Sequence, residues 1–141
     1  MKRTSLWLTC TIGSNLDEVG QLCREIRALL ADSTCCAERF AVELLARESL
    51  SNAVIHGNRF SADKKVEIHV RVAPRWIRLS VKDEGEGFLW RNCRRVPDAD
   101  DPCGRGMVLY GLYARRVKFN ARGNEVTLWV LRRKSNQKEK S

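Results

Sequence analysis

The fold is decided by residues 65–87, which read KVEIHVRVAPRWIRLSVKDEGEG. Apolar side chains alternate with polar ones along 66–72 and again along 77–81, which is the period of a β-strand with one buried face. Between these runs, Pro74 and Arg75 supply a turn. The stretch therefore predicts an antiparallel hairpin whose second strand leads into a glycine-rich segment.

Outward from this hairpin, the chain switches between helical and strand periods. The elements expected before it are a strand at Leu6–Thr11, a helix capped by Ser14 or Asn15, and a second helix from about Cys36 to His56 with a left-handed end at Gly57-Asn58. Those expected after it are a long loop at Phe88–Cys103, a short helix from Gly104 to about Ala114, and a closing hairpin of Val117–Asn120 and Val126–Leu131.

These elements describe one α+β domain. We expect a two-layer sandwich in which helices cover one face of a mixed, mainly antiparallel β-sheet. A chain of 141 residues is long enough to bury a core of its own. The domain is predicted over residues 1–133, followed by a basic, frayed tail at 134–141.

Composition excludes several classes of protein. No apolar run approaches the roughly 20 residues of a transmembrane helix, and no signal peptide is recognisable, so we expect a cytoplasmic protein. The six cysteines include no C-x-x-C pair, and neither histidine lies near two of them at zinc-finger spacing. We therefore expect free thiols, mostly small buried apolar side chains, at Cys10, Cys23, Cys35 and Cys36.

The formal net charge of +9 raises the question of a nucleic-acid partner. The basic residues between 91 and 122 lack the interleaved aromatic side chains of a single-strand stacking platform. We therefore expect a basic surface that faces acidic ligands or proteins, with neither nucleic acid nor a membrane as a partner.

A polar pair lies on the predicted second helix, where residues 47–58 read RESLSNAVIHGN. Glu48 and Asn52 are four residues apart, so at about 100° per residue they point within about 40° of one another. Apolar side chains gather on the opposite side of the helix, at Val42, Ala46, Leu50, Ala53 and Val54. This spacing suits a helix that packs on one side and presents a carboxylate and an amide on the other. An ordinary exposed polar pair has the same spacing.

A second cluster, Asp83-Glu84-Gly85-Glu86-Gly87, directly follows a predicted strand. Glycines at alternate positions let the backbone approach a planar ligand, and a carboxylate can accept hydrogen bonds from an exocyclic amine such as that of adenine. A plain turn after a strand has a similar composition.

The third cluster is Gly104-Arg105-Gly106-Met107, at the start of a predicted helix. Free amides and the positive end of the helix dipole favour a phosphate group there. A capping turn is the simpler interpretation, and no Walker-type phosphate loop occurs in the sequence.

In this order and on these elements, the three clusters resemble the GHKL (Bergerat-fold) ATPases, and within them the anti-sigma-factor serine/threonine kinases of the RsbW type. Glu48 to Gly57 looks like their N box, Asp83 to Gly87 like their first glycine box, and Gly104 to Met107 like their second. The resemblance covers roughly Glu38 to Val130.

The resemblance implies ATP and Mg²⁺ as cofactors. It makes Glu48 the general base, Asn52 a ligand of the metal ion and Asp83 the reader of the adenine amine. The remaining implied nucleotide-binding residues are Gly85, Gly87, Gly104, Arg105, Gly106, Met107 and Thr127, with the loop Phe88–Cys103 as a lid. The arginine that meets the γ-phosphate stays open among Arg94, Arg95 and Arg105.

The implied function is an ATP-dependent serine/threonine protein kinase. It would act as a homodimeric anti-sigma factor that binds a sigma factor and phosphorylates a STAS-domain antagonist in a partner-switching pathway. Two alternatives stay open: a non-catalytic ATP-binding switch module of a signalling complex, and a histidine-kinase-like ATPase domain.

Overall fold

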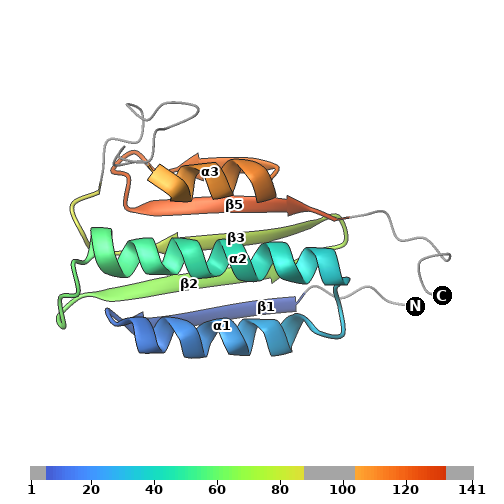
Figure 1. Ribbon diagram of the computed structural model, residues 1–141, viewed down its shortest axis with the longest axis horizontal. Coiled ribbons are helices and arrows are strands. Elements are labelled where there is room, and N and C mark those ends of the chain that lie inside the picture. Colours follow the sequence, from blue (N-terminus) through green and yellow to red (C-terminus); the bar gives the residue numbers. More distant parts are fainter. Residues whose placement is uncertain (1–5, 88–103, 133–141) are drawn as a thin grey trace, which may run out of the picture.

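The computed structural model describes residues 6–87 and 104–132, which form a sheet with three helices on one face (Figure 1). The elements in chain order are β1 (Leu6–Gly13), α1 (Leu16–Leu30), α2 (Cys36–Asn52), a π-helix (Ala53–Gly57), β2 (Lys65–Val72), β3 (Trp76–Lys82), α3 (Gly104–Tyr113), β4 (Arg116–Phe119) and β5 (Glu125–Leu131). The expected α+β sandwich is confirmed.

The sheet has the strand order β1-β2-β3-β5-β4, and its four pairings are all antiparallel. No parallel pair occurs among the described strands, although the sequence analysis expected a mixed sheet. The central hairpin of β2 and β3 pairs Val72 with Ile77, and its turn is closed by a 2.8 Å hydrogen bond from Ala73 N to Trp76 O.

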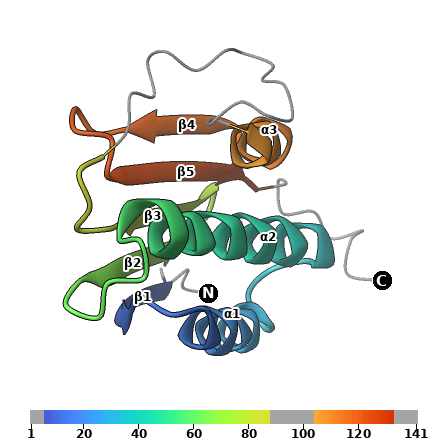
Figure 2. The same ribbon diagram turned by 60° about the vertical axis from the view of Figure 1, so that its left-hand side comes forward.

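The core lies between the sheet and the helices. Figures 1 and 2 show α1 and α2 side by side on the face formed by β1, β2 and β3, with α3 beside β5. Because side chains alternate along a strand, every second residue of β2, β3 and β5 enters this core. The strands contribute Val66, Ile68, Val70, Val72, Ile77, Leu79, Val81, Val126, Leu128 and Val130, and the helices contribute Leu22, Ile26, Leu45 and Leu50 among others.

The first helix begins at a side-chain cap. Asn15, one of the two expected caps, accepts a 2.9 Å hydrogen bond from the amide of Glu18, and the Glu18 carboxylate accepts one of 2.8 Å from Gly13 N. The other candidate, Ser14, is buried and donates instead to the carbonyl of Lys64. Asn15 therefore satisfies amides that the first turn leaves unpaired, while Ser14 ties β1 to the start of β2.

The second helix ends differently from the prediction. After Asn52 it widens into one π turn, closed by a 2.7 Å hydrogen bond from Asn58 N to Ala53 O. Asn58 keeps a right-handed backbone with φ of −86°, and the left-handed residues are Arg59 and Phe60, with φ of 51° and 60°. A single extra residue in the last turn therefore displaced the reversal beyond Gly57-Asn58.

The cysteine prediction was only partly right. Cys23 is buried and Cys10 half-buried, whereas Cys35 and Cys36 are exposed because they begin α2 at its solvent-facing end. Among the described helices, none combines the length and the apolar character needed to cross a bilayer.

Candidate functional site

The polar face of α2 meets the first turns of α3. Asn52 Nδ2 lies 3.4 Å from the hydroxyl of Tyr110. A methyl group on Gly106 would come within 2.7 Å of Asn52 Nδ2 and 3.1 Å of Glu48 Oε2. The missing side chain of Gly106 is therefore what lets α3 approach the carboxylate and the amide. The structure thus brings Gly106 to Glu48 and Asn52, from which it is far apart in the sequence.

Tyr110 is a member of this cluster that the sequence analysis did not identify. It is 4 % exposed. Burial raises the pKa of its hydroxyl well above the usual range; the negative charge of Glu48 adds to this, and the hydrogen bond from Asn52 opposes it. The phenol therefore stays neutral and can accept a hydrogen bond from Asn52. Its place in the sequence, four residues after Gly106, was the only available signal.

The opposite side of α2 is buried, as expected. Ala46, Leu50 and Ala53 lie in the core, and Ser49 between them is 2 % exposed. The Ser49 hydroxyl donates a 2.7 Å hydrogen bond to the carbonyl of Leu45, so this buried polar group is satisfied within the helix. The packing of this side sets which residues of α2 face α3.

A second group of residues surrounds the carboxylate of Asp83, which directly follows β3. Gly85 N donates a 2.8 Å hydrogen bond to Asp83 Oδ1. A methyl group on Gly57 would overlap the Asp83 carboxylate, and one on Gly85 would overlap the carbonyl of Gly57. Both glycines are therefore needed for the close contact between the end of α2 and the end of β3, which lie side by side in Figure 1.

The C-terminal turns of α2 connect the two groups. Gly57, against Asp83, is five residues, or about one π-helical turn, beyond Asn52. The intervening residues form the π-helix. The helical segment therefore presents Glu48, then Asn52, then Gly57 along its length. The Asp83 carboxylate lies against Gly57 at the end of this segment.

Burial raises the pKa of Asp83, while the hydrogen bond from Gly85 N and the positive charges of Arg122 and Lys64 oppose the rise. A half-buried carboxylate of this kind has few water molecules to accept from, which suits it to accept a hydrogen bond from a bound ligand. Its backbone is held in place by Asn124. Asp83 N donates to Asn124 O at 2.9 Å, and Asn124 Nδ2 donates to Asp83 O at 2.8 Å.

Asn124 was missed by the sequence analysis, which saw only a turn in Ala121–Asn124. Asn120 shapes that turn, because its side-chain oxygen accepts hydrogen bonds from the amides of Gly123, Asn124 and Glu125. Two asparagines at the ends of a short turn were the available signal, since this side chain often bonds to nearby backbone.

Asn58 is a third residue whose role could not be predicted from the sequence. It is 2 % exposed, and its Nδ2 donates to Ser14 Oγ and to Lys65 O, both at 3.0 Å, while its Oδ1 accepts from Glu84 N at 2.8 Å. Asn58 therefore joins the end of α2, the end of β1, the start of β2 and the Asp83 segment. Its predicted role was only to end a helix.

Gly87 closes the first glycine-rich segment against the turn between β4 and β5. Its φ is +87°, which strains any residue with a side chain, and a methyl group there would overlap the carbonyl of Arg122. The position is therefore restricted to glycine twice over, by conformation and by contact.

The structure places the other predicted residues as follows. Met107 is half-buried and packs against the core, and Gly104 begins α3. The Arg105 side chain, the predicted lid and Arg94 and Arg95 within it lie outside the described residues.

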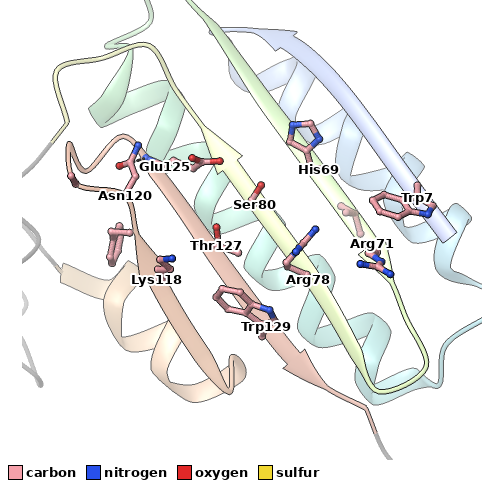
Figure 3. A pocket seen from close by; sticks show the side chains of 13 residues that line it. Trp7, His69, Arg71, Arg78, Ser80, Lys118, Asn120, Glu125, Thr127 and Trp129 are labelled. Atoms are coloured by element: carbon pink, nitrogen blue, oxygen red, sulfur yellow. Dashed lines mark hydrogen bonds between the residues drawn. The ribbon is translucent and has the colours of Figure 1, made fainter. Parts of the chain in front are cut away.

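Thr127 is not part of the candidate site. Val126 and Leu128 are buried beneath the helices, so alternation along β5 turns Thr127 to the opposite face of the sheet. There it lies among Ser80, Lys118 and Trp129 and lines a hollow of about 690 Å³ (Figure 3). The prediction that Thr127 lies with the other site residues was therefore wrong.

Fold and geometry together define a class of protein. Three helices cover one face of an antiparallel sheet, and one of them carries a carboxylate and an amide. A half-buried aspartate follows a strand and lies between two glycines, and a further glycine lies in the first turn of the last helix. This is the arrangement of an ATP-binding α+β sandwich. Residues 12–130 match the family model described as the histidine kinase-like ATPase domain, and the chain belongs to this family. ATP binding is the property that the family name implies.

A solved structure agrees on the fold. The chain is similar to the structure of the RsbU and RsbW domains of Rv1364c from Mycobacterium tuberculosis, with a TM-score of 0.59 and 21% sequence identity. The match covers 93% of this chain and 34% of the other, so the chain spans about a third of that two-domain structure. No curated protein matches the sequence.

Proposed function

We propose that the chain is an ATP-dependent serine/threonine protein kinase that acts as an anti-sigma regulatory factor in a partner-switching pathway. The observation that carries the proposal is the position of Glu48. It lies on the same face of α2 as Asn52, and its carboxylate is next to Gly106 in the first turn of α3. A carboxylate beside a phosphate-binding helix start is suited to accept a proton from an attacking hydroxyl.

The nucleotide would lie along the C-terminal half of α2. Asp83 would accept a hydrogen bond from the adenine amine, and Gly85 and Gly87 would shape the nucleotide site by letting Gly57 and Arg122 pack closely beside it. The triphosphate would lie at the start of α3, near Gly104 and Gly106, where the first helical amides have no partner within the helix and the helix dipole is positive. Arg105 and Met107 follow in the same turn.

The described residues fit a magnesium ion held mainly by phosphate oxygens. They contain no group of three histidine, cysteine or acidic side chains that could hold a metal ion alone. Asn52 donates its amide nitrogen to Tyr110, which leaves Oδ1 as an oxygen ligand. Bound magnesium would neutralise charge on the triphosphate, and Asn52 would fix its position.

In the transfer step, a serine or threonine hydroxyl of the partner protein attacks the γ-phosphorus. The new bond joins this oxygen to phosphorus, the bond from phosphorus to the β,γ-bridging oxygen breaks, and ADP leaves. The hydroxyl proton passes to Glu48. Neutral Tyr110 positions Asn52, so the chain contributes orientation and one proton acceptor.

The partners are inferred from the similarity of this chain to a structure that contains an RsbW domain. We infer a homodimer that binds a sigma factor and phosphorylates a STAS-domain antagonist, in the cytoplasm. The net charge of +9 supports acidic partner surfaces.

A second candidate is a non-catalytic switch in which ATP only changes the conformation of a signalling complex. The match to a family named for histidine kinases also keeps a histidine-kinase-like ATPase domain in view. Both candidates give Asn52 and Asp83 the same roles as the leading proposal. They differ from it because no serine or threonine hydroxyl receives the phosphoryl group.

The test is transfer of label from γ-labelled ATP with Mg²⁺ to purified STAS-domain proteins. Wild type is compared with Glu48→Gln, and Glu25→Gln on the exposed side of α1 is the matched control. We expect label on serine or threonine, lost in Glu48→Gln and retained in Glu25→Gln. Unimpaired ATP binding without transfer to any acceptor would favour the switch, and label on histidine would favour the histidine-kinase-like domain.

A further inference from the structure

The face of the sheet opposite the helices carries an ordered row of tryptophan and arginine side chains. Trp7 pairs with Arg71, Arg71 with Arg78, Arg78 with Trp129, and Trp129 with Arg116. The five residues, which we call the Trp–Arg row, therefore lie directly opposite one another across all five strands. No described helix covers this face, and Figure 3 shows Trp7, Arg71, Arg78 and Trp129 along it.

Two contacts arrange the row before any ligand arrives. The guanidinium of Arg71 lies 4.7 Å from the ring centroid of Trp7, and that of Arg116 lies 4.8 Å from the ring centroid of Trp129. Each arginine is thus held against an indole by a cation–π contact. Trp7 nevertheless remains 61 % exposed, so a large part of this ring is open to a partner.

The centre of the row lacks the negative charge that it needs. Arg71 and Arg78 are directly opposite each other on β2 and β3, an arrangement that destabilises a sheet. Within residues 6–87 and 104–132, no carboxylate forms an ion pair with Arg71, Arg78 or Arg116. The Nε atom of Arg71 is also buried without a hydrogen-bond partner among these residues. An anion between the two guanidinium groups would satisfy both.

The next row across the sheet is polar and largely uncharged. It consists of Thr9, His69, Ser80, Thr127 and Lys118. Together the two rows contain no aliphatic side chain, and they line most of the 690 Å³ hollow. Trp and Arg also anchor protein–protein interfaces, but the apolar core of such an interface is larger than two indole rings supply. Hydroxyl and imidazole groups instead suit the polar edges of nucleic-acid bases.

We propose that this face binds single-stranded nucleic acid along the Trp–Arg row. One phosphate lies between Arg71 and Arg78, and bases stack on Trp7 and Trp129, which are three strand spacings or about 14 Å apart. Stacking on aromatic rings beside positive charge is how sheet surfaces hold single strands. Residues 91–122 lack interleaved aromatic side chains, so the sequence alone does not predict such a partner. Here the interleaving arises from residues on different strands.

The experiment uses the full chain and fluorescein-labelled eight-nucleotide probes, oligo(U) and oligo(dT), followed by anisotropy and tryptophan quenching. Trp7→Leu and Arg78→Gln test the row. Phe40→Leu and Arg24→Gln, on the helix layer, are matched controls for an exposed aromatic residue and for one positive charge. We expect each row variant to weaken binding about fivefold or more, and each control to change it less than about twofold. Tighter binding of oligo(U) would identify RNA as the preferred strand.

Salt and competitors distinguish this proposal from simpler ones. With about three phosphate contacts, one shared by Arg71 and Arg78, one at Arg116 and one at Lys118, the logarithm of the binding constant should fall with the logarithm of salt concentration at a slope of about −2. The proposal is overturned by absence of binding at low salt, by equal losses in row and control variants, or by a duplex that binds as well as a single strand. It is also overturned if polyglutamate binds more tightly than either probe, or if light scattering shows a dimer that Arg78→Gln dissociates. ATP binding on the helix side should be unchanged in Arg78→Gln.

Discussion

The side-chain amide of Asn52 on α2 lies 3.4 Å from the hydroxyl of Tyr110 on α3, and this contact fixes how the two helices face each other at the candidate site. Asn52 has two polar ends. Because the nitrogen donates to Tyr110, the oxygen is left available for the proposed magnesium nucleotide. The aromatic ring of Tyr110 is at the same time part of the core. One residue thus couples packing of α3 to the orientation of the proposed metal ligand.

Tyr110→Phe should weaken Mg-ATP binding. The substitution keeps the buried ring and removes only the hydroxyl, so Asn52 loses the partner that orients it. A lost hydrogen bond of this kind is worth about 1 kcal/mol, so we expect an affinity about fivefold lower, measured by calorimetry. Tyr113→Phe, at a half-buried ring that contacts Phe40, is the control and should leave the affinity unchanged. Equal effects of the two substitutions would contradict the assigned role.

Gly106→Ala should impair the site while leaving the fold intact. The new methyl group would meet the ends of the Asn52 and Glu48 side chains. Both side chains can move aside at little cost in stability, but they would then leave the positions that the proposed site requires. ATP affinity and phosphoryl transfer should both fall at least about tenfold. Gly111→Ala on the same helix meets nothing within 4 Å. It should raise the free energy of unfolding by about 0.5 to 1 kcal/mol and leave ATP binding alone.

Local features of this chain could be predicted from its sequence, whereas contacts between distant residues could not. Local patterns predicted every strand and α-helix of the described chain, because alternation, helical spacing and capping are local properties, but they did not predict the π-helix at Ala53–Gly57. The three clusters were found because each lies within a few consecutive residues. Tyr110, Asn58 and Asn124 were missed because their roles depend on partners 58, 26 and 41 residues away.

The error at Thr127 has a different origin. The sequence analysis had predicted the strand correctly, and its alternation already implied that Thr127 and Val126 face opposite sides. Which side carries the helices was not decided by β5 alone. It follows from the burial of Val126 and Leu128 beneath the helices, which is a property of the assembled layers.

Asn58→Ala should destabilise the protein and weaken ATP binding together. The substitution removes the partner of Ser14 Oγ, Lys65 O and Glu84 N, and these hydrogen bonds are buried or partly buried. We expect the free energy of unfolding in urea to fall by about 2 to 4 kcal/mol. ATP affinity should fall as well, measured at a temperature where the variant is folded, because the Asp83 segment loses its anchor.

Asn15→Ala is the control for this change. It removes the cap of α1, which should cost about 1 kcal/mol, but it breaks none of the hydrogen bonds that Asn58 makes with Ser14, Lys65 and Glu84. ATP affinity should then stay at the wild-type value. If both variants lost ATP affinity in proportion to their stability, Asn58 would have no specific effect on the site.

Asp83→Asn should stabilise the free protein at neutral pH while it weakens ATP binding. Burial raises the pKa of Asp83 in the folded chain, so the ionised carboxylate costs the folded state some stability. This cost is fully present above the folded pKa and disappears as the pH falls below the ordinary value of an unfolded aspartate. Asparagine carries no charge, and its oxygen can still accept the hydrogen bond from Gly85 N. At about pH 8 the variant should therefore be more stable than wild type, by a margin that solvent screening keeps small.

The advantage of Asp83→Asn should shrink as the pH is lowered from about 8 to about 4, because wild-type Asp83 then becomes protonated. Urea unfolding at a series of pH values measures this difference directly. Asp63→Asn, at an exposed aspartate, is the control and should show little difference from wild type at any pH. A variant that is less stable than wild type at neutral pH would show that the ionised carboxylate stabilises the fold. Asp83 would then be a structural anion held by Arg122 and Lys64, and not a carboxylate kept at some cost for a ligand.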